Sequence, residues 1–266
     1  ETYRRASTHP DFDQLAKLDP EGNTYAVFRP RRLTAEELRD AMLAVTGELN
    51  RKSGGIPARP DMNIEAALQP RMIMGTFAPS YVPDVKAEMR NRRSVYALKF
   101  RGQRDPFMTT FNQPSPDKSC ELRDNSNVTP QVFTLFNSEE SADRALAFAA
   151  RVLKETDGDK AAVSRAFRLA FGRMPEKAEA YDAVQLWKAS AEEQVQLNPK
   201  PRTYPTEIIR SANEENTGET FTFAEKLFEY LDYQPDLQPH QVGARIRGFA
   251  DLCLVLLNAN EFLYVY

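Results

Sequence analysis

Apolar residues recur at helical spacing through three consecutive segments between residues 138 and 194, and this pattern constrains the fold more than any other feature. An apolar residue every three or four positions gives a helix one face that packs on a core. The turn TDGD at 156–159 separates the first two segments, and Gly172 and Pro175 separate the second from the third. Glycine is typical of helix ends and proline of helix starts. The sequence therefore predicts three helices: 138–155, 159–172 and 175–194.

Caps and apolar stripes predict further helices on either side of these three. Thr34 and Glu37 form a capping-box pattern before an apolar stripe, and the SGG at 53–55 is expected to end that helix. Thr129 followed by Pro130 is typical of a helix start, with threonine as the cap. Two more helices are predicted from their apolar residues: FTFAEKLFEYL at 221–231 and ARIRGFADLCLVLLN at 244–258.

Strand signals are few. Two segments, RMIMGTF at 71–77 and SVYALKF at 94–100, have the alternation of apolar and polar residues expected of strands. They are predicted to pair as one small β-hairpin. We therefore expect a mainly α fold, a multi-helix bundle-like domain with a loop-rich segment. The chain divides into a loop-rich mixed segment with one long helix, 1–126, and a helical segment, 127–266. The two segments are expected to share one core.

Composition excludes several classes of protein. The 266 residues carry a formal charge of -3, so the chain has no general attraction to phosphate backbones and nucleic acid is not expected as a partner. No apolar run approaches the roughly 20 residues of a membrane-spanning helix, so no transmembrane segment is expected. The chain begins ETYRRAS, without methionine or a signal-peptide pattern, which predicts a piece of a longer polypeptide.

Histidine and cysteine are scarce. The chain has 2 of each and contains no C-x-x-C-H, H-E-x-x-H or paired C-x-x-C motif. No c-type haem, structural zinc or other cofactor is therefore expected. The acidic loops DPEGN at 19–23 and DGD at 157–159 do not complete a twelve-residue calcium loop. Turns and helix caps explain both loops more simply, and no metal site is predicted.

Cys120 is the first candidate site residue, because it lies among charged and turn-forming residues in DKSCELRDNSNVTPQ at 117–131. A catalytic cysteine needs a nearby base, and both His9 and His240 are more than a hundred residues away. The simpler interpretation is a loop cysteine beneath neighbouring helices. A disulfide with Cys253, in the apolar segment FADLCLVLLN, is the alternative.

The arginine-rich run MRNRRSVYALKFRGQRD at 89–105 is the second candidate. Planar guanidinium groups bind carboxylate and sulfate groups through two parallel hydrogen bonds, so the run is a candidate surface for an anionic glycan. The alternative is that these arginines pair with acidic residues of the same chain. The candidate binding residues of this run are Arg90, Arg92, Arg93, Tyr96, Arg101 and Arg104.

A third possibility is an enzyme acting on a glycan. Hydrolysis of a glycosidic bond needs two carboxyl groups about 5–10 Å apart in a cleft. No catalytic residue is assigned from the sequence. The first acids to consider are Glu37, Asp40, Asp117 and Glu121.

Six segments, in the same order along almost the whole chain, carry a resemblance to a known family. They are YRRAS, LDPEGNTYAVFRPRRLTAEELRDAMLAVTGEL, RRSVYALKFR, FNQPSPDKSCELRDNSNVTPQVFTLFNS, AFRLAFGRMPEKAE and LVLLNANEFLYV. Together they resemble the planctomycete-type cytochrome-associated domain of unknown function, the PSD-one family, in its central and C-terminal parts. Cys120 and Arg123 occupy regular positions for the family, and the resemblance assigns them no reaction.

The resemblance implies a setting. Such domains belong to large exported bacterial proteins, so an extracytoplasmic location, periplasmic or secreted, is expected. The implied partners are the remaining N-terminal part of the same polypeptide and its companion domains, one of them often cytochrome-like. A possible anionic glycan is the further partner suggested by the arginine-rich run.

Three functional hypotheses follow. The favoured one is a non-catalytic scaffold or interaction domain, which predicts an exposed apolar patch. A polysaccharide-related enzyme predicts instead a deep pocket that holds a carboxyl group with a raised pKa. An anionic-glycan-binding module predicts an open groove with exposed arginines and aromatic residues.

Overall fold

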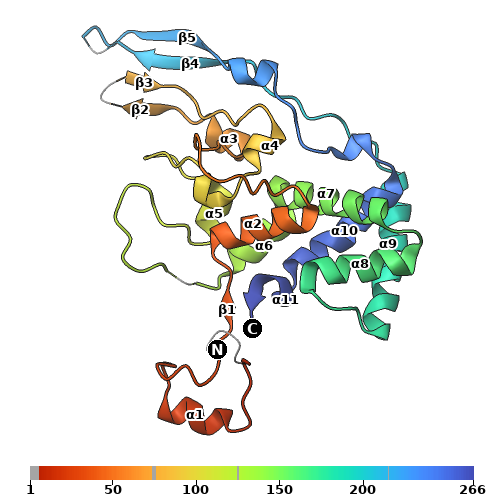
Figure 1. Cartoon of the computed structure of the whole chain (residues 1–266). Coiled ribbons are helices and arrows are strands. Elements are labelled where there is room, and N and C mark those ends of the chain that lie inside the picture. The colour runs from red at the N-terminus through yellow and green to blue at the C-terminus, as the bar shows by residue number, and fades with distance from the viewer. Residues whose placement is uncertain (1–5, 74–75, 125, 215) are drawn as a thin grey trace.

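Four long helices form the centre of the computed structural model, which describes residues 6–73, 76–124, 126–214 and 216–266 (Figure 1). They are α7 (Glu139–Glu155), α8 (Asp159–Phe171), α9 (Lys177–Val195) and α10 (Ala244–Asn258). Helix α10 packs against both α7 and α9. At the α9–α10 crossing a Cβ on Gly248 would lie 2.4 Å from the backbone nitrogen of Ala191, so only glycine allows this close approach.

The four helices expected from apolar spacing in this region are confirmed. Ser138 caps α7 by accepting a hydrogen bond from the N–H of Ser141, and Gly172 ends α8 in the left-handed conformation. The indole of Trp187 on α9 lies 4.5 Å from the ring of Phe249 on α10, between ring centroids. These aromatic residues are almost fully buried, so the predicted stripes face the core.

Helix α2 (Ala35–Thr46) begins as predicted and ends early. The capping box of Thr34 and Glu37 is formed, but Gly47, with φ 79°, ends the helix six residues before the SGG. Helix α6 (Thr129–Asn137) also begins one residue earlier than expected, because Val128 rather than Thr129 is the cap residue.

One predicted helix is wrong. Residues 220–226 form strand β5 (Thr220–Lys226), which pairs antiparallel with β4 (Glu207–Asn213) from Glu207↔Lys226 to Asn213↔Thr220. Thr222, Phe221 and Phe223 favour a strand, and the segment EIIRSAN supplies a partner of equal length. Phe228–Leu231 forms one 3₁₀ turn, and it is the only helical part of the predicted segment.

The predicted pairing of 71–77 with 94–100 is also wrong. Strands β2 (Arg71–Ile73) and β3 (Thr76–Ala78) pair with each other, because a local hairpin closes a much shorter loop. Residues 94–96 form a 3₁₀ turn, and Ala97 forms a bridge with Ala58. The described residues thus contain two hairpins rather than one. Figure 1 shows β2–β3 beside β4–β5, and the ring centroids of Phe77 and Phe223 are 5.3 Å apart.

Short elements complete the mainly α fold. They are α1 (Phe12–Leu18), α3 (Ile64–Ala67), α4 (Ala87–Arg90), α5 (Pro106–Thr110), α11 (Asn260–Leu263) and the strand pair β1 (Arg31–Arg32) with β6 (Tyr264–Val265). Parts of three quoted motifs lie outside the described residues, namely Tyr3 to Arg5, Met74 with Gly75, and Asn125. Within the part of the chain that is described, no helix has the length and apolar character of a membrane span.

One main core joins elements from both halves of the sequence. Leu38 and Met42 of α2 and Phe107 of α5 belong to the same buried cluster as Phe148 of α7 and Leu257 of α10. A smaller cluster of Val82, Leu227 and Tyr230 lies toward the two hairpins. The polar cavity described next is lined by residues of both clusters.

Candidate functional site

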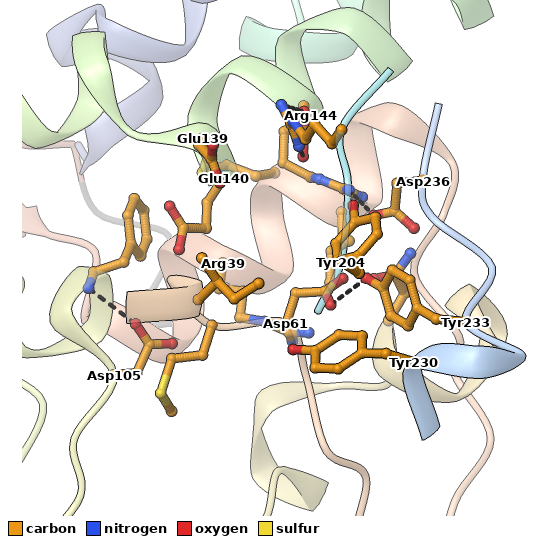
Figure 2. A pocket seen from close by; sticks show the side chains of 18 of the residues that line it. Arg39, Asp61, Asp105, Glu139, Glu140, Arg144, Tyr204, Tyr230, Tyr233 and Asp236 are labelled. Carbon is orange, nitrogen blue, oxygen red and sulfur yellow. Dashed lines mark hydrogen bonds and ion pairs between the residues drawn. The ribbon is translucent and has the colours of Figure 1, made fainter. Parts of the chain in front are cut away.

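A polar cavity of about 360 Å³ lies where segments distant in the sequence meet (Figure 2). Its walls come from α2, the starts of α5 and α7, and the loops around 61–64, 201–204 and 230–236. The ionisable and aromatic lining residues are Arg39, Asp61, Asp105, Phe107, Glu139, Glu140, Asp143, Arg144, Arg202, Tyr204, Tyr230, Tyr233 and Asp236.

Arg90, at the end of α4, organises one wall of this cavity from behind. Its side chain is fully buried, with Nε donating to Asp61 at 2.7 Å and Nη2 donating to Asp236 at 2.8 Å. Three main-chain carbonyls accept its remaining N–H groups at 2.8–2.9 Å. The Tyr233 ring covers the guanidinium, with Cζ 4.4 Å from the ring centroid. The buried charge is therefore fully hydrogen-bonded.

Arg144 of α7 extends this network into the cavity. It forms ion pairs with Asp236 and Glu48, while the hydroxyl of Tyr233 donates to Asp61 at 2.5 Å. Burial alone would raise the pKa of Asp236, but the charges of Arg144 and Arg90 outweigh it and the pKa is lowered. We call Asp61, Arg90, Arg144, Tyr233 and Asp236 the paired wall.

Glu140 and Asp105 form a second wall with a different character, which we call the acid wall. Neither carboxyl group has an ion-pair partner among the described residues. Burial, followed by the charge of Asp105, raises the pKa of Glu140 to about 7. Burial also raises the pKa of Asp105 to about 6, against two hydrogen bonds from the N–H groups of Phe107 and Met108. Around pH 7 the carboxyl group of Glu140 is therefore divided between its protonated and ionised forms.

Arg39 of α2 lies between the two walls (Figure 2). Its guanidinium is held by main-chain carbonyls, with Nη2 donating to Arg90 at 2.8 Å and Nη1 donating to Arg92 at 2.9 Å. Its nearest carboxylate is that of Asp40, with a nitrogen–oxygen distance of 3.7 Å. Desolvation consequently lowers the pKa of Arg39. Its positive charge in turn holds the pKa of Asp105 lower than burial alone would.

Three tyrosines close the side of the cavity opposite the acid wall. The rings of Tyr204 and Tyr230 are stacked at an interplanar angle of 16°, with centroids 5.6 Å apart. Tyr204 also lies 4.6 Å from Tyr233, between centroids. Arg202, next to this cluster, is held by both carboxylate oxygens of Asp143 at 2.6 and 2.7 Å. The cavity thus combines aromatic faces, fixed polar groups and the acid wall, a combination typical of a ligand site.

The family model of PSD1, a protein of unknown function (DUF1553), matches residues 1–187. The chain belongs to this family. None of the curated proteins and none of the solved structures matches the chain. The match ends within α9, so some residues that line the cavity lie inside the matched part of the chain and others lie beyond it. Arg39, Asp61, Asp105, Glu140 and Arg144 lie inside the matched part of this PSD1 chain.

The tyrosine side of the cavity lies beyond the match. Arg202, Tyr204, Tyr230, Tyr233 and Asp236 all follow residue 187. The segment that carries them runs from the end of α9 through the β4–β5 hairpin to α10 (Figure 1). The acid wall therefore belongs to the PSD1-matched part, and the tyrosine side of the cavity to the part that follows it.

Two arginines of the arginine-rich run at 89–105, Arg90 and Arg92, are buried. Arg90 belongs to the paired wall, and Arg92 donates to the main-chain carbonyls of Ile56 and Lys52 while its guanidinium stacks on Tyr96, with Cζ 4.6 Å from the centroid. Arg93 and Arg101 are exposed. The structure therefore separates the run into internal and surface groups rather than gathering it in one groove.

The cysteine-bearing loop also differs from expectation. Cys120 is exposed, so the prediction that it lies beneath neighbouring helices is wrong. Its thiol donates to the carbonyl of Leu122 at 3.2 Å, and Arg123 pairs with Glu36 at 2.6 Å. Cys253 is buried in α10, and both cysteines are free, so the alternative disulfide is not formed. This loop does not line the cavity.

None of the four acids proposed first for a glycan enzyme lines the cavity, and three of them have structural roles elsewhere. Glu37 completes the α2 capping box and pairs with Arg31 at 2.8 Å. Asp40 accepts two hydrogen bonds from Ser94, and Asp117 accepts one from the N–H of Gly102. Glu121 is exposed. The acids that do line the cavity were missed.

A sequence signal for one missed acid exists. The segment SEESAD places Glu139, Glu140 and Asp143 at the start of a helix with regular apolar spacing, but this spacing does not show which of them faces a cavity. Asp105 is recognisable only as a helix cap before Pro106. Pairing these two positions needs the tertiary structure, because they are separated by α6.

The acidic loops at 19–23 and 157–159 form a turn and a helix start. The carboxylate of Asp19 accepts hydrogen bonds from the N–H groups of Asn23 and Thr24, as expected of a turn. Asp159 begins α8 and pairs with Arg245 at 3.0 Å. Among the residues described, no group of three or more His, Cys, Asp or Glu side chains is arranged to hold a metal ion.

Proposed function

We propose that this PSD1 chain is a polysaccharide-related enzyme that hydrolyses a glycosidic bond of a neutral glycan in the polar cavity, with Glu140 and Asp105 as its acid–base pair. The observation that carries the proposal is the presence of both carboxyl groups in one cavity without ion-pair partners among the described residues. Burying an acid without a partner costs stability, so such an arrangement is characteristic of functional sites.

The two acids differ in a way that assigns their roles. The pKa of Glu140, about 7, is higher than that of Asp105, about 6, so Glu140 is assigned as the proton donor and Asp105 as the acceptor. Glu140 would donate its proton to the leaving glycosidic oxygen, while Asp105 accepts a proton from the attacking water. The proton released by water thus balances the proton given to the leaving group.

The charge of the lining favours a neutral substrate over an anionic one. Six carboxyl groups and three guanidinium groups line the cavity. Arg144 and Arg202 are already neutralised by carboxylates, so they offer little to a sulfate or uronate group. Hydroxyl groups of a sugar can both donate to and accept from these side chains, and sugar rings pack on tyrosine faces.

Hydrolysis of neutral oligosaccharides tests the proposal. We would measure the release of reducing ends from cellotetraose, xylotetraose, mannotetraose and chitotetraose. Glu140→Gln and Asp105→Asn should each lower the rate at least about 100-fold, whereas Glu192→Gln, at an exposed acid of α9, should not. Activity that persists in both cavity variants, or its absence with all four substrates, would reject the proposal.

A second candidate function is the scaffold or interaction domain favoured by the sequence. It is supported by an apolar face on α6, where Val132, Phe133 and Phe136 are 54%, 62% and 44% exposed. In this case the partner would be the rest of the polypeptide or its companion domains. Phe133→Ser should then release that contact in a longer polypeptide, measured as faster proteolysis between domains, while leaving hydrolysis unchanged.

We also propose the setting that the family resemblance implies. The protein would be extracytoplasmic, as part of a large exported protein of the planctomycete type with a cytochrome-like companion domain. This proposal is supported by the resemblance alone. Fractionation of cells that express the full polypeptide, followed by detection of the chain in periplasm and medium, tests it.

A further inference from the structure

A smaller cavity of about 50 Å³ adjoins the polar cavity. The two cavities share four lining residues, Arg39, Asp61, Met62 and Asp105. Asp105 of the acid wall therefore lies at the junction between them. A substituent of a sugar bound in the larger cavity could enter the smaller one beside the reacting carboxyl groups.

The lining of the small cavity is mostly apolar. Leu98, Phe100 and Met108 contribute side chains to it. Polar groups there are largely engaged, because the Tyr81 hydroxyl donates to the carbonyl of Pro60 at 2.6 Å. Arg104 likewise donates to the main-chain carbonyl of Gln113 at 2.8 Å. A charged or strongly hydrated substituent would lose its solvation in such a space.

Gln103 is the residue of this lining that has a polar atom without a partner among the described residues. Its side chain is buried, and its Nε2 donates to the carbonyls of Ala66 and Ala67 at 2.9 and 3.0 Å, which fixes the orientation of the amide. Its Oε1 is buried without a hydrogen-bond partner among the described residues. A buried acceptor without a donor is destabilising, and a donor on a ligand in this cavity would satisfy it.

We propose that the small cavity binds the acetamido group of an N-acetylated sugar, with its N–H donated to Gln103 Oε1 and its methyl group packed among Leu98, Phe100 and Met108. The acetamido group combines one donor with a small apolar end, which matches the lining. A plain hydroxyl would leave the apolar walls unfilled. A charged substituent of either sign would lose its hydration among the apolar walls, whereas the acetamido group is neutral. This inference rests on the proposed function and names its substrate class.

Binding measurements separate this inference from the hydrolysis itself. Glu140→Gln, which retains the cavity but lacks the acid, would be titrated by calorimetry with chitotetraose, cellotetraose and the tetramer of glucosamine. Chitotetraose should bind at least about tenfold more tightly than either of the others, since one well-made buried hydrogen bond and one packed methyl group each contribute at about this level. Equal affinities, tighter binding of the glucosamine tetramer, or no binding of chitotetraose would overturn the inference.

Two variants assign the preference to the small cavity. Gln103→Met in the same Glu140→Gln background keeps the size of the side chain but removes the acceptor, and should reduce the affinity ratio below threefold. Ala97→Leu fills the small cavity from another side and should do the same. Gln185→Met, at an exposed glutamine of α9, is the matched control and should keep the full ratio. A full ratio in Gln103→Met and Ala97→Leu, with folding verified by circular dichroism, would overturn the inference.

The two proposals fail in different ways. If cellotetraose is hydrolysed and Glu140→Gln abolishes this, but chitotetraose is not preferred, the acid–base function stands and the acetamido site is rejected. If chitotetraose binds with the preference described but no oligosaccharide is cleaved, the acetamido site stands and the hydrolytic function is rejected.

Discussion

Asp236 of the paired wall and the two acids of the acid wall have opposite electrostatic surroundings. In the paired wall, Asp236 is held by Arg90 and Arg144, and these charges keep its pKa low. In the acid wall, burial raises the pKa values of Glu140 and Asp105 because no guanidinium group is paired with either among the described residues. Buried arginines therefore form ion pairs with Asp236 in the paired wall, and no arginine forms one with Glu140 or Asp105 among the described residues.

This difference separates structure from chemistry. A fully paired buried charge network fixes the relative positions of α4, α7 and the 230–236 segment. An acid whose pKa lies near 7 contributes nothing comparable to stability, but it can donate and accept protons at neutral pH. The comparison predicts that substitutions in the two walls change stability with opposite signs.

The largest expected effect is in the paired wall. Arg90→Met would leave the buried carboxylate of Asp236 with one partner fewer and remove the ion pair of Asp61, so the free energy of unfolding should fall by about 3–5 kcal/mol at pH 7. Urea denaturation followed by circular dichroism measures this loss. Arg123→Met is the matched control, because Arg123 pairs with Glu36 at the surface and should cost about 1 kcal/mol or less. Equal losses in the two variants would contradict the distinction drawn for Arg90.

The next effect is a gain of stability in the acid wall. Folding raises the pKa of Glu140 from 4.5 to about 7, so the folded protein keeps a proton that the unfolded chain releases between these values. The free energy of unfolding therefore falls as pH rises through this window and stays low above it. Glu140→Gln removes the penalty and should be about 1–3 kcal/mol more stable than the natural protein at pH 8, with little difference at pH 4.

Urea denaturation at a series of pH values tests this sign. Asp105→Asn should behave similarly, with its window between 3.8 and about 6, and asparagine can still cap α5. Glu192→Gln, at an exposed acid, should show no pH-dependent gain. A Glu140→Gln protein that is less stable than the natural protein at pH 8 would show that Glu140 has a stabilising partner and does not belong to a separate wall.

Sequence alone predicted the elements that depend on local signals. Apolar spacing and caps were sufficient for α2, α7, α8, α9 and α10, because amphipathic faces and capping residues act within a few turns. The error at β5 has the opposite cause. Ala224, Glu225 and Lys226 are good helix formers, and only pairing with β4 overrides their preference.

Such local signals do not identify the candidate site. Asp105 and Glu140 are ordinary helix-start residues in the sequence, at positions where acids are common. Their significance arises because the loops at 61–64, 201–204 and 230–236 enclose them in one cavity. The arginine-rich run shows the reverse, since a conspicuous pattern in sequence is divided between the paired wall and the surface.

The smallest expected effects concern the exposed part of that run, and they test the remaining alternative. Arg93 and Arg101 are exposed and belong to neither wall, so Arg93→Ala and Arg101→Ala should change the free energy of unfolding by no more than about 0.5 kcal/mol. If the protein is instead an anionic-glycan-binding module, its retention on heparin should fall in both variants and with rising salt. Retention that is weak, and equal in both variants and in Lys188→Ala of α9, would leave the polar cavity as the binding surface. A strong loss confined to Arg93→Ala and Arg101→Ala would transfer ligand recognition from the cavity to this surface, and the comparison of the two walls would then describe stability alone.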